Sequence, residues 1–125
     1  MAKASKEEFE KALVGLEEAH GECTVQVVGS KAYKLIRDAT IQRFEFCVEL
    51  AWKVALKSLG ATATSAKPAL REMLKSAMIT DINLWFDFVE ARNKSSHTYD
   101  ENIAAEVFSH ISKFIDEARA LLSKL

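Results

Sequence analysis

The sequence predicts an all-α protein, an antiparallel up-and-down bundle of four to five helices. Helix-breaking residues are scarce, because the 125 residues include one proline and four glycines. Apolar residues recur three and four positions apart over long segments, the spacing that places them on one side of a helix. The length matches one core of ordinary size, so residues 1–125 are expected to form a single domain.

The first helix is expected to begin at Ser5, where the order Ser-Lys-Glu-Glu matches a capping box. One of its faces carries Phe9, Leu13, Leu16 and His20. Gly21 is the expected end of this helix, and residues 24–28 are interpreted as a connector.

A long second helix is expected over residues 30–59, ended by Gly60. Apolar residues occupy nearly every side of it, which is typical of a helix at the centre of a bundle or at an interface between subunits. Its charges suit either a structural ion-pair network at such an interface or a nucleotide site, and they include Arg37, Arg43, Glu45 and Glu49. We favour the structural role, with Arg43 as the exception.

Two shorter helices follow. Pro68 fits the first turn of a helix over residues 68–77. Thr80 or Asp81 then caps a helix that runs into the polar residues 92–97. The side chains expected to reach the core from that helix are Ile82, Trp85, Phe86 and Val89.

Asp100 is the expected cap of a last helix. Its buried stripe consists of Ile103, Val107, Phe108, Ile111, Phe114, Ile115, Ala118 and Leu122. No segment repeats, and residues 21–30 and 61–66 match no functional pattern. The predicted elements therefore account for nearly the whole chain.

Composition excludes several classes of function. With 17 basic and 18 acidic residues the net charge is -1, so DNA is not an expected ligand and any RNA contact must be local. Cys23 and Cys47 form no metal-binding pair, so we expect buried free thiols, and neither a metal nor another cofactor. Free thiols, no signal peptide and no apolar segment of membrane length together favour a cytoplasmic protein without membrane contact.

Residues 90–99, with the sequence EARNKSSHTY, carry most of the chemical information. Arg92 offers a planar fork for phosphate oxygens, and His97 can take and give a proton near neutral pH. Together they suffice to bind a phosphodiester and move protons without a metal. The same residue types also occur at ordinary helix C-termini, where Arg, Lys and His interact favourably with the helix dipole. A purely structural role for residues 90–99 therefore stays open.

Two blocks together resemble the nucleotidyltransferase substrate-binding family, a branch of the HEPN (higher eukaryote and prokaryote nucleotide-binding) superfamily. They are residues 37–53 (RDATIQRFEFCVELAWK) and residues 92–101 (RNKSSHTYDE), in the order the family has them. The resemblance implies an all-helical homodimer in complex with a minimal nucleotidyltransferase. Many superfamily members are metal-independent endoribonucleases, and such two-component pairs behave as toxin and antitoxin.

The resemblance also assigns roles to single residues through the motif Arg-x4-His-x-Tyr. Arg92 and His97 take the catalytic positions, and Asn93 is the polar residue that follows the arginine. Tyr99 is the implied acceptor of AMP, and its modification silences the toxin. The motif is intact in this chain.

We expect Ser96 and Arg43, together with Arg92, to bind a phosphate group of the nucleotide or RNA. In a regular helix, residues five apart are rotated by about 140°, so Arg92 and His97 do not share a face. Either the helix unwinds near Ser95, or a second subunit completes the site across a two-fold axis. We expect the composite site.

Two other functions stay open beside the endoribonuclease. One is a non-catalytic subunit that presents nucleotide or another substrate to the nucleotidyltransferase. The other is a structural helical dimer whose motif is vestigial. The endoribonuclease ranks first because the motif is complete.

Overall fold

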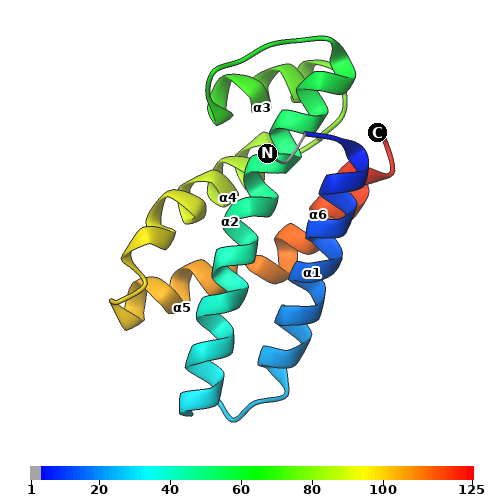
Figure 1. The fold of residues 1–125 in the computed structure, drawn as a ribbon. Helices are drawn as coiled ribbons and strands as arrows, with labels where there is room; N and C mark the ends of the chain where they lie inside the picture. Colours follow the sequence, from blue (N-terminus) through cyan, green and yellow to red (C-terminus); the bar gives the residue numbers. More distant parts are fainter. Residues whose placement is uncertain (1–3) are drawn as a thin grey trace.

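The longest helix, α2 (Lys31–Leu59), passes through the middle of a helical bundle and packs against every other element of the computed structural model (Figure 1). The structure describes residues 4–125. The remaining elements are α1 (Lys6–Thr24), α3 (Ala66–Lys75), α4 (Ile82–Lys94), the 3-10 helix η1 (Ser95–His97), α5 (Glu101–Ser109) and α6 (Ile111–Leu122). The predicted all-α bundle is confirmed. No helix within these residues is both long and apolar enough to cross a membrane.

The first helix begins as predicted but ends later. The Ser5 hydroxyl accepts the N–H of Glu8 at 3.1 Å, and α1 then continues through Gly21 to Thr24. The expected end at Gly21 was wrong, because a glycine inside a helix costs only about 1 kcal/mol. Cys23 is fully buried, and its Sγ lies 3.7 Å from the carbonyl oxygen of Tyr33 in α2. Packing of this last turn against α2 therefore outweighs the glycine.

The core contains a cluster of four aromatic rings from three helices. Phe114 of α6 lies edge-on to Phe44, Phe88 and Trp85, with centroids 5.2, 5.2 and 5.8 Å away. All four side chains are buried. Phe86 had been expected in the core, but it is only partly buried and lies beside the guanidinium of Arg71. The buried face of α4 is thus rotated toward Phe88.

The predicted last helix is interrupted at His110. Its N–H bonds to the carbonyl oxygen of Val107 at 3.1 Å, and the chain changes direction there between α5 and α6 (Figure 1). The physical reason is packing, because α5 lies against α2 and α4 whereas α6 lies against α1 and α2. The residues of the expected stripe that are only partly buried are Ile103, Phe108 and Ile115.

The short helix α3 contains Pro68 in its first turn, as predicted. It closes on Ala77, which has a left-handed backbone (φ 59°) and is followed by a bond from the Met78 N–H to the Met73 carbonyl oxygen at 2.9 Å. This is the geometry of a Schellman motif, with alanine at the position that glycine usually fills. The helix therefore ends in a conformation that is unfavourable for its residue.

The two cysteines are free and buried, as predicted. Burial raises the pKa of the Cys47 thiol to about 12, with a smaller contribution from the charge of Glu17. Burial also raises the pKa of Cys23. Both thiols are therefore protonated at neutral pH.

Candidate functional site

The polar motif lies at the corner between α4 and α5 (Figure 1). Helix α4 ends at Lys94, and the chain tightens into η1. Ser95 is buried there, and its hydroxyl donates to the carbonyl oxygen of Arg92 at 2.5 Å. The α-helix thus changes at Ser95, which was one of the two alternatives that the spacing of Arg92 and His97 had posed.

His97 and Tyr99 lie together on the surface of this corner. The Tyr99 hydroxyl is 3.4 Å from Nδ1 of His97, and the rings meet edge-on at 5.9 Å. Which of the two groups donates depends on the histidine tautomer. Tyr99 is 85% exposed, so its side chain extends into solvent.

Arg92 is paired with an acidic residue that the sequence had not linked to it. Its Nε lies 3.0 Å from Oε1 of Glu49 on α2, and Lys53 approaches the same carboxylate at 3.7 Å. The Nε–H does not point at the oxygen, so this buried nitrogen has an ion-pair partner but no hydrogen bond. Glu49 lies in the first family block, but only the packing of α2 against α4 brings it to the motif.

The two motif residues Arg92 and His97 are not linked to each other within the described part of a single chain. Among the described residues, no hydrogen bond or ion pair joins Arg92 to His97, and Ser96 and Asn93 are exposed. Asn93 lies at a cavity of about 400 Å³ between α2, α4 and the start of α3. The polar and aromatic residues that line this cavity are Glu49, Trp52, Thr64, Ser65, Lys67 and Asn93.

Arg43 lies on another side of α2. Its Nη1 donates to the carbonyl oxygen of Gly15 in α1 at 2.7 Å. The contact that the structure shows for this guanidinium is therefore with α1 rather than with the motif. Its assignment to phosphate binding stays a prediction.

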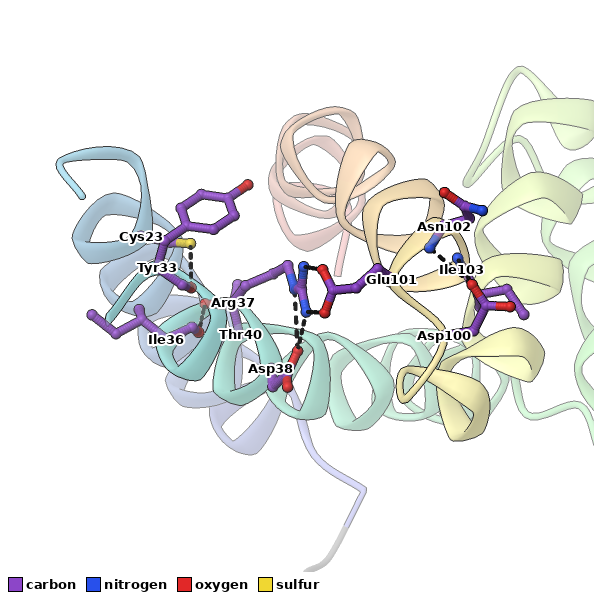
Figure 2. Close-up of polar contacts among 10 residues, drawn as sticks. All are labelled: Cys23, Tyr33, Ile36, Arg37, Asp38, Thr40, Asp100, Glu101, Asn102 and Ile103. Carbon is purple, nitrogen blue, oxygen red and sulfur yellow. Dashed lines mark hydrogen bonds and ion pairs between the residues drawn. The ribbon is translucent and has the colours of Figure 1, made fainter. Parts of the chain in front are cut away.

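Arg37 anchors the beginning of α5, immediately after Tyr99 (Figure 2). This arginine is 3% exposed, and its two Nη groups donate to the carboxylate of Glu101 at 2.9 and 3.1 Å. Its Nε and Nη2 also donate to Oδ1 of Asp38, both at 3.1 Å. The hydrogen bonds to Arg37 lower the pKa of the Glu101 carboxyl. Arg37 thus has a structural role, but its ion pairs join residues of one chain rather than the two subunits for which the network was expected.

Asp100 caps the same helix, as predicted. Its Oδ1 accepts the N–H groups of Asn102 at 2.9 Å and Ile103 at 3.4 Å (Figure 2). The ion pair and the cap together fix where α5 starts. They consequently determine where the short segment bearing His97 and Tyr99 emerges.

The all-helical bundle, with the Arg-x4-His-x-Tyr motif at the corner between α4 and α5, agrees with the HEPN-like fold that the sequence blocks indicated. Residues 5–125 match the family model described as nucleotidyltransferase substrate binding protein like. The chain therefore belongs to the nucleotidyltransferase substrate-binding family, as its two sequence blocks indicated.

Individual relatives agree with this membership. The chain is 36% identical over 93 residues to the probable ribonuclease HepT of Haemophilus influenzae, a match that covers 68% of this chain and 64% of that protein. The match thus spans less than two thirds of the relative's length. A Haemophilus influenzae structure, described as the fold of a substrate binding domain of a nucleotidyltransferase, has a TM-score of 0.80 at 28% identity, covering 94% of this chain and 96% of that one. A protein of Thermus thermophilus has a TM-score of 0.78 at 27% identity, covering 93% of this chain and 97% of that one.

Proposed function

We propose that this protein is the partner subunit of a minimal nucleotidyltransferase and acts as a metal-independent endoribonuclease. The observation that carries the proposal is the intact Arg92, His97 and Tyr99 set, with the histidine and tyrosine exposed side by side. The name of the Haemophilus influenzae relative and the family description support it.

The two catalytic residues have complementary tasks. RNA cleavage without a metal requires removal of the ribose 2′-hydroxyl proton, attack on phosphorus and protonation of the leaving 5′-oxygen. His97 can carry these proton transfers, an effect of roughly 10²–10⁴-fold. Arg92 offsets the developing negative charge on the phosphate. Its ion pair with Glu49 is made through Nε, which leaves the two Nη groups for phosphate oxygens.

A second copy of the chain completes the site in this proposal. One histidine cannot at the same moment be acid and base, and no hydrogen bond or ion pair joins His97 to Arg92 in the described part of one chain. Helix α2 also exposes apolar side chains in one row, with Leu35 63% and Phe46 47% exposed. Exposed apolar surface of this kind is typical of an interface. A two-fold dimer would cover such a surface and supply two arginines and two histidines.

Modification of Tyr99 provides the regulation. The tyrosine oxygen attacks the α-phosphorus of ATP, pyrophosphate leaves, and the hydroxyl proton passes to solvent or a base. The bound AMP places bulk and a negative phosphodiester beside His97, since the two side chains are 3.4 Å apart. The added group therefore competes with an RNA phosphate for the same place.

Cleavage of RNA by unmodified protein tests the proposal. Intact mass first verifies that Tyr99 carries no AMP. We expect cleavage in the presence of a chelator, and a loss of at least about 10²-fold in His97→Ala and Arg92→Ala. His110→Ala is the matched control, because His110 lies away from the motif at the junction of α5 and α6. An unmodified dimer that cuts no RNA contradicts the proposal.

The cavity beside Asn93 favours a second candidate, a non-catalytic subunit that presents nucleotide to the nucleotidyltransferase. In that case nucleotide binding persists in His97→Ala and no RNA is cleaved by the wild-type protein. Absence of binding to both nucleotide and the enzyme subunit removes this candidate.

A further inference from the structure

Two buried side-chain nitrogens without a hydrogen-bond partner lie at one place in the structure. Among the described residues they are Nε1 of Trp52 and Nε of Arg92. Trp52 lines the cavity between α2, α4 and the start of α3, and Arg92 is paired with Glu49, which lines the same cavity. Buried polar groups in folded proteins are nearly always paired. Because Nε of Arg92 already has Glu49 as its ion-pair partner, the unpaired indole nitrogen of Trp52 is the group at this cavity that points to a ligand.

The shape of the cavity suits a small polar ligand. Its volume of about 400 Å³ falls in the usual range for such sites. Apolar atoms of Trp52, Ala66 and Val89 line one part of it. The Glu49 carboxylate and the Asn93 amide supply acceptors and a donor for directional hydrogen bonds.

The start of α3 adds groups that remain free. Ser65 is the residue that caps α3, yet its side chain makes no capping hydrogen bond. Its hydroxyl and the first N–H groups of the helix consequently stay available beside Thr64. The unpaired nitrogen of Trp52 in the same cavity is a second, independent observation, and it supports the assignment of this helix end to a ligand site.

We propose that the cavity is a nucleoside subsite, which takes the base and ribose of one ribonucleotide whose phosphate lies on Arg92. The base packs on the apolar surface, meets the Asn93 amide and accepts a hydrogen bond from the indole N–H of Trp52. The ribose hydroxyls donate to Glu49, because a carboxylate only accepts hydrogen bonds. The inference rests on the proposed function, since the place of the phosphate is taken from it.

Glu49 gives the subsite its selectivity. Its negative charge offsets that of Arg92 at 3.0 Å, so a bare anion gains less there than a group that brings hydroxyl donors as well. Inorganic phosphate should accordingly bind weakly and without dependence on the cavity. The ribonucleotide comes either from an RNA chain or from the free nucleotide pool, and the experiment separates these sources.

Calorimetric titration of the full-length protein with AMP and with a short RNA is the test. His97→Ala is the background for every RNA titration, so that no cleavage occurs. Thr64→Trp fills the cavity, and Thr80→Trp, at an exposed position in the loop before α4, is its control outside the cavity. Thermal melting by circular dichroism verifies that each variant is folded.

A second pair of variants tests the carboxylate. Glu49→Gln removes the charge that holds Arg92 and accepts from the ribose, and Glu45→Gln, one turn earlier on α2, is its control. We expect Thr64→Trp to weaken binding of AMP or RNA about tenfold or more. Glu49→Gln should reduce about tenfold the preference for AMP over inorganic phosphate, titrated in the same way, because the charge that disfavours a bare anion is gone. The controls should be unchanged. Loss of AMP binding alone identifies a free-nucleotide site, whereas loss of RNA binding alone identifies a subsite for the chain.

The inference is overturned if both probes bind Thr64→Trp as tightly as its control and Glu49→Gln keeps the preference for AMP over inorganic phosphate, or if neither probe binds the protein. RNA cleavage that depends on Arg92 but not on Thr64→Trp would refute the subsite and leave the proposed function intact. Binding that depends on the cavity, in a protein that cuts no RNA, would support the subsite and contradict the proposed function.

Discussion

Replacement of Arg37 by alanine tests how the segment that carries Tyr99 is held in place. This arginine is 3% exposed and makes four hydrogen bonds of 2.9 to 3.1 Å to Glu101 and Asp38. The side chains of the two acids are about half exposed, at 56% and 50%. In Arg37→Ala they return to water, which limits the loss.

The expected destabilisation is about 2–3 kcal/mol. Charge-assisted hydrogen bonds contribute more than neutral ones, but solvent screening discounts the part made by exposed carboxylates. Removing a partner from a fully buried pair costs roughly 3–5 kcal/mol, which is an upper bound here. The control is Arg43→Ala on the same helix, whose guanidinium makes one hydrogen bond, to Gly15. We expect the control to change stability by about 0.5 kcal/mol or less.

Urea denaturation followed by circular dichroism measures both variants. The pH dependence adds a second check, because pairing with Arg37 lowers the pKa of Glu101 in the folded state. The stability from this pair is fully present above the unfolded value of about 4.3 and is lost as the pH falls through the lower folded value. Arg37→Ala should therefore lose less stability on acidification than the wild type. Equal free energies of unfolding for the two variants at neutral pH would refute this role of Arg37.

Three further predictions concern the fold. Phe114→Ala removes a fully buried ring from the aromatic cluster and should cost about 3–5 kcal/mol in urea denaturation, and a loss below about 1 kcal/mol would contradict the packing described. Ala77 and Gly60 both have a left-handed backbone (φ 59° and 66°), which favours glycine. Ala77→Gly should therefore raise the free energy of unfolding by about 0.5–1 kcal/mol, and Gly60→Ala should lower it by about 1 kcal/mol. A change of the same sign in both variants would be inconsistent with this geometry. Cys47 should not react with a thiol reagent at neutral pH in the folded protein, because burial raises its pKa to about 12, and rapid labelling under native conditions would show that the helix is open there.

Helix positions could be predicted where local chemistry determines them. Ser5, Asp81 and Asp100 cap the helices that their side chains predicted, because a cap is decided by a few neighbouring residues. The break at His110 and the continuation of α1 past Gly21 were missed, since both depend on which neighbouring helix a segment packs against. Local sequence does not contain that information.

The candidate site shows the same limit. The spacing of Arg92 and His97 posed two alternatives, a helix that unwinds near Ser95 or a site completed by a second subunit. The structure has the helix change at Ser95 and brings His97 and Tyr99 side by side, whereas the composite site that we expected stays a prediction. The pairing of Arg92 with Glu49 joins residues from two distant segments of the chain, so it could not be predicted from either alone. The buried nitrogen of Trp52 is likewise recognisable as unpaired only once its surroundings are known.

The most direct test of the proposed function is the intact mass of the protein after co-expression with its nucleotidyltransferase partner. The chain has two tyrosines, and Tyr33 packs against Phe108 whereas Tyr99 is 85% exposed. We expect a gain of one or more AMP units in the wild type and in Tyr33→Phe, and no gain in Tyr99→Phe. A gain that persists in Tyr99→Phe, or no gain from a nucleotidyltransferase shown to modify other acceptors, would contradict the assignment of Tyr99 as the switch of an endoribonuclease.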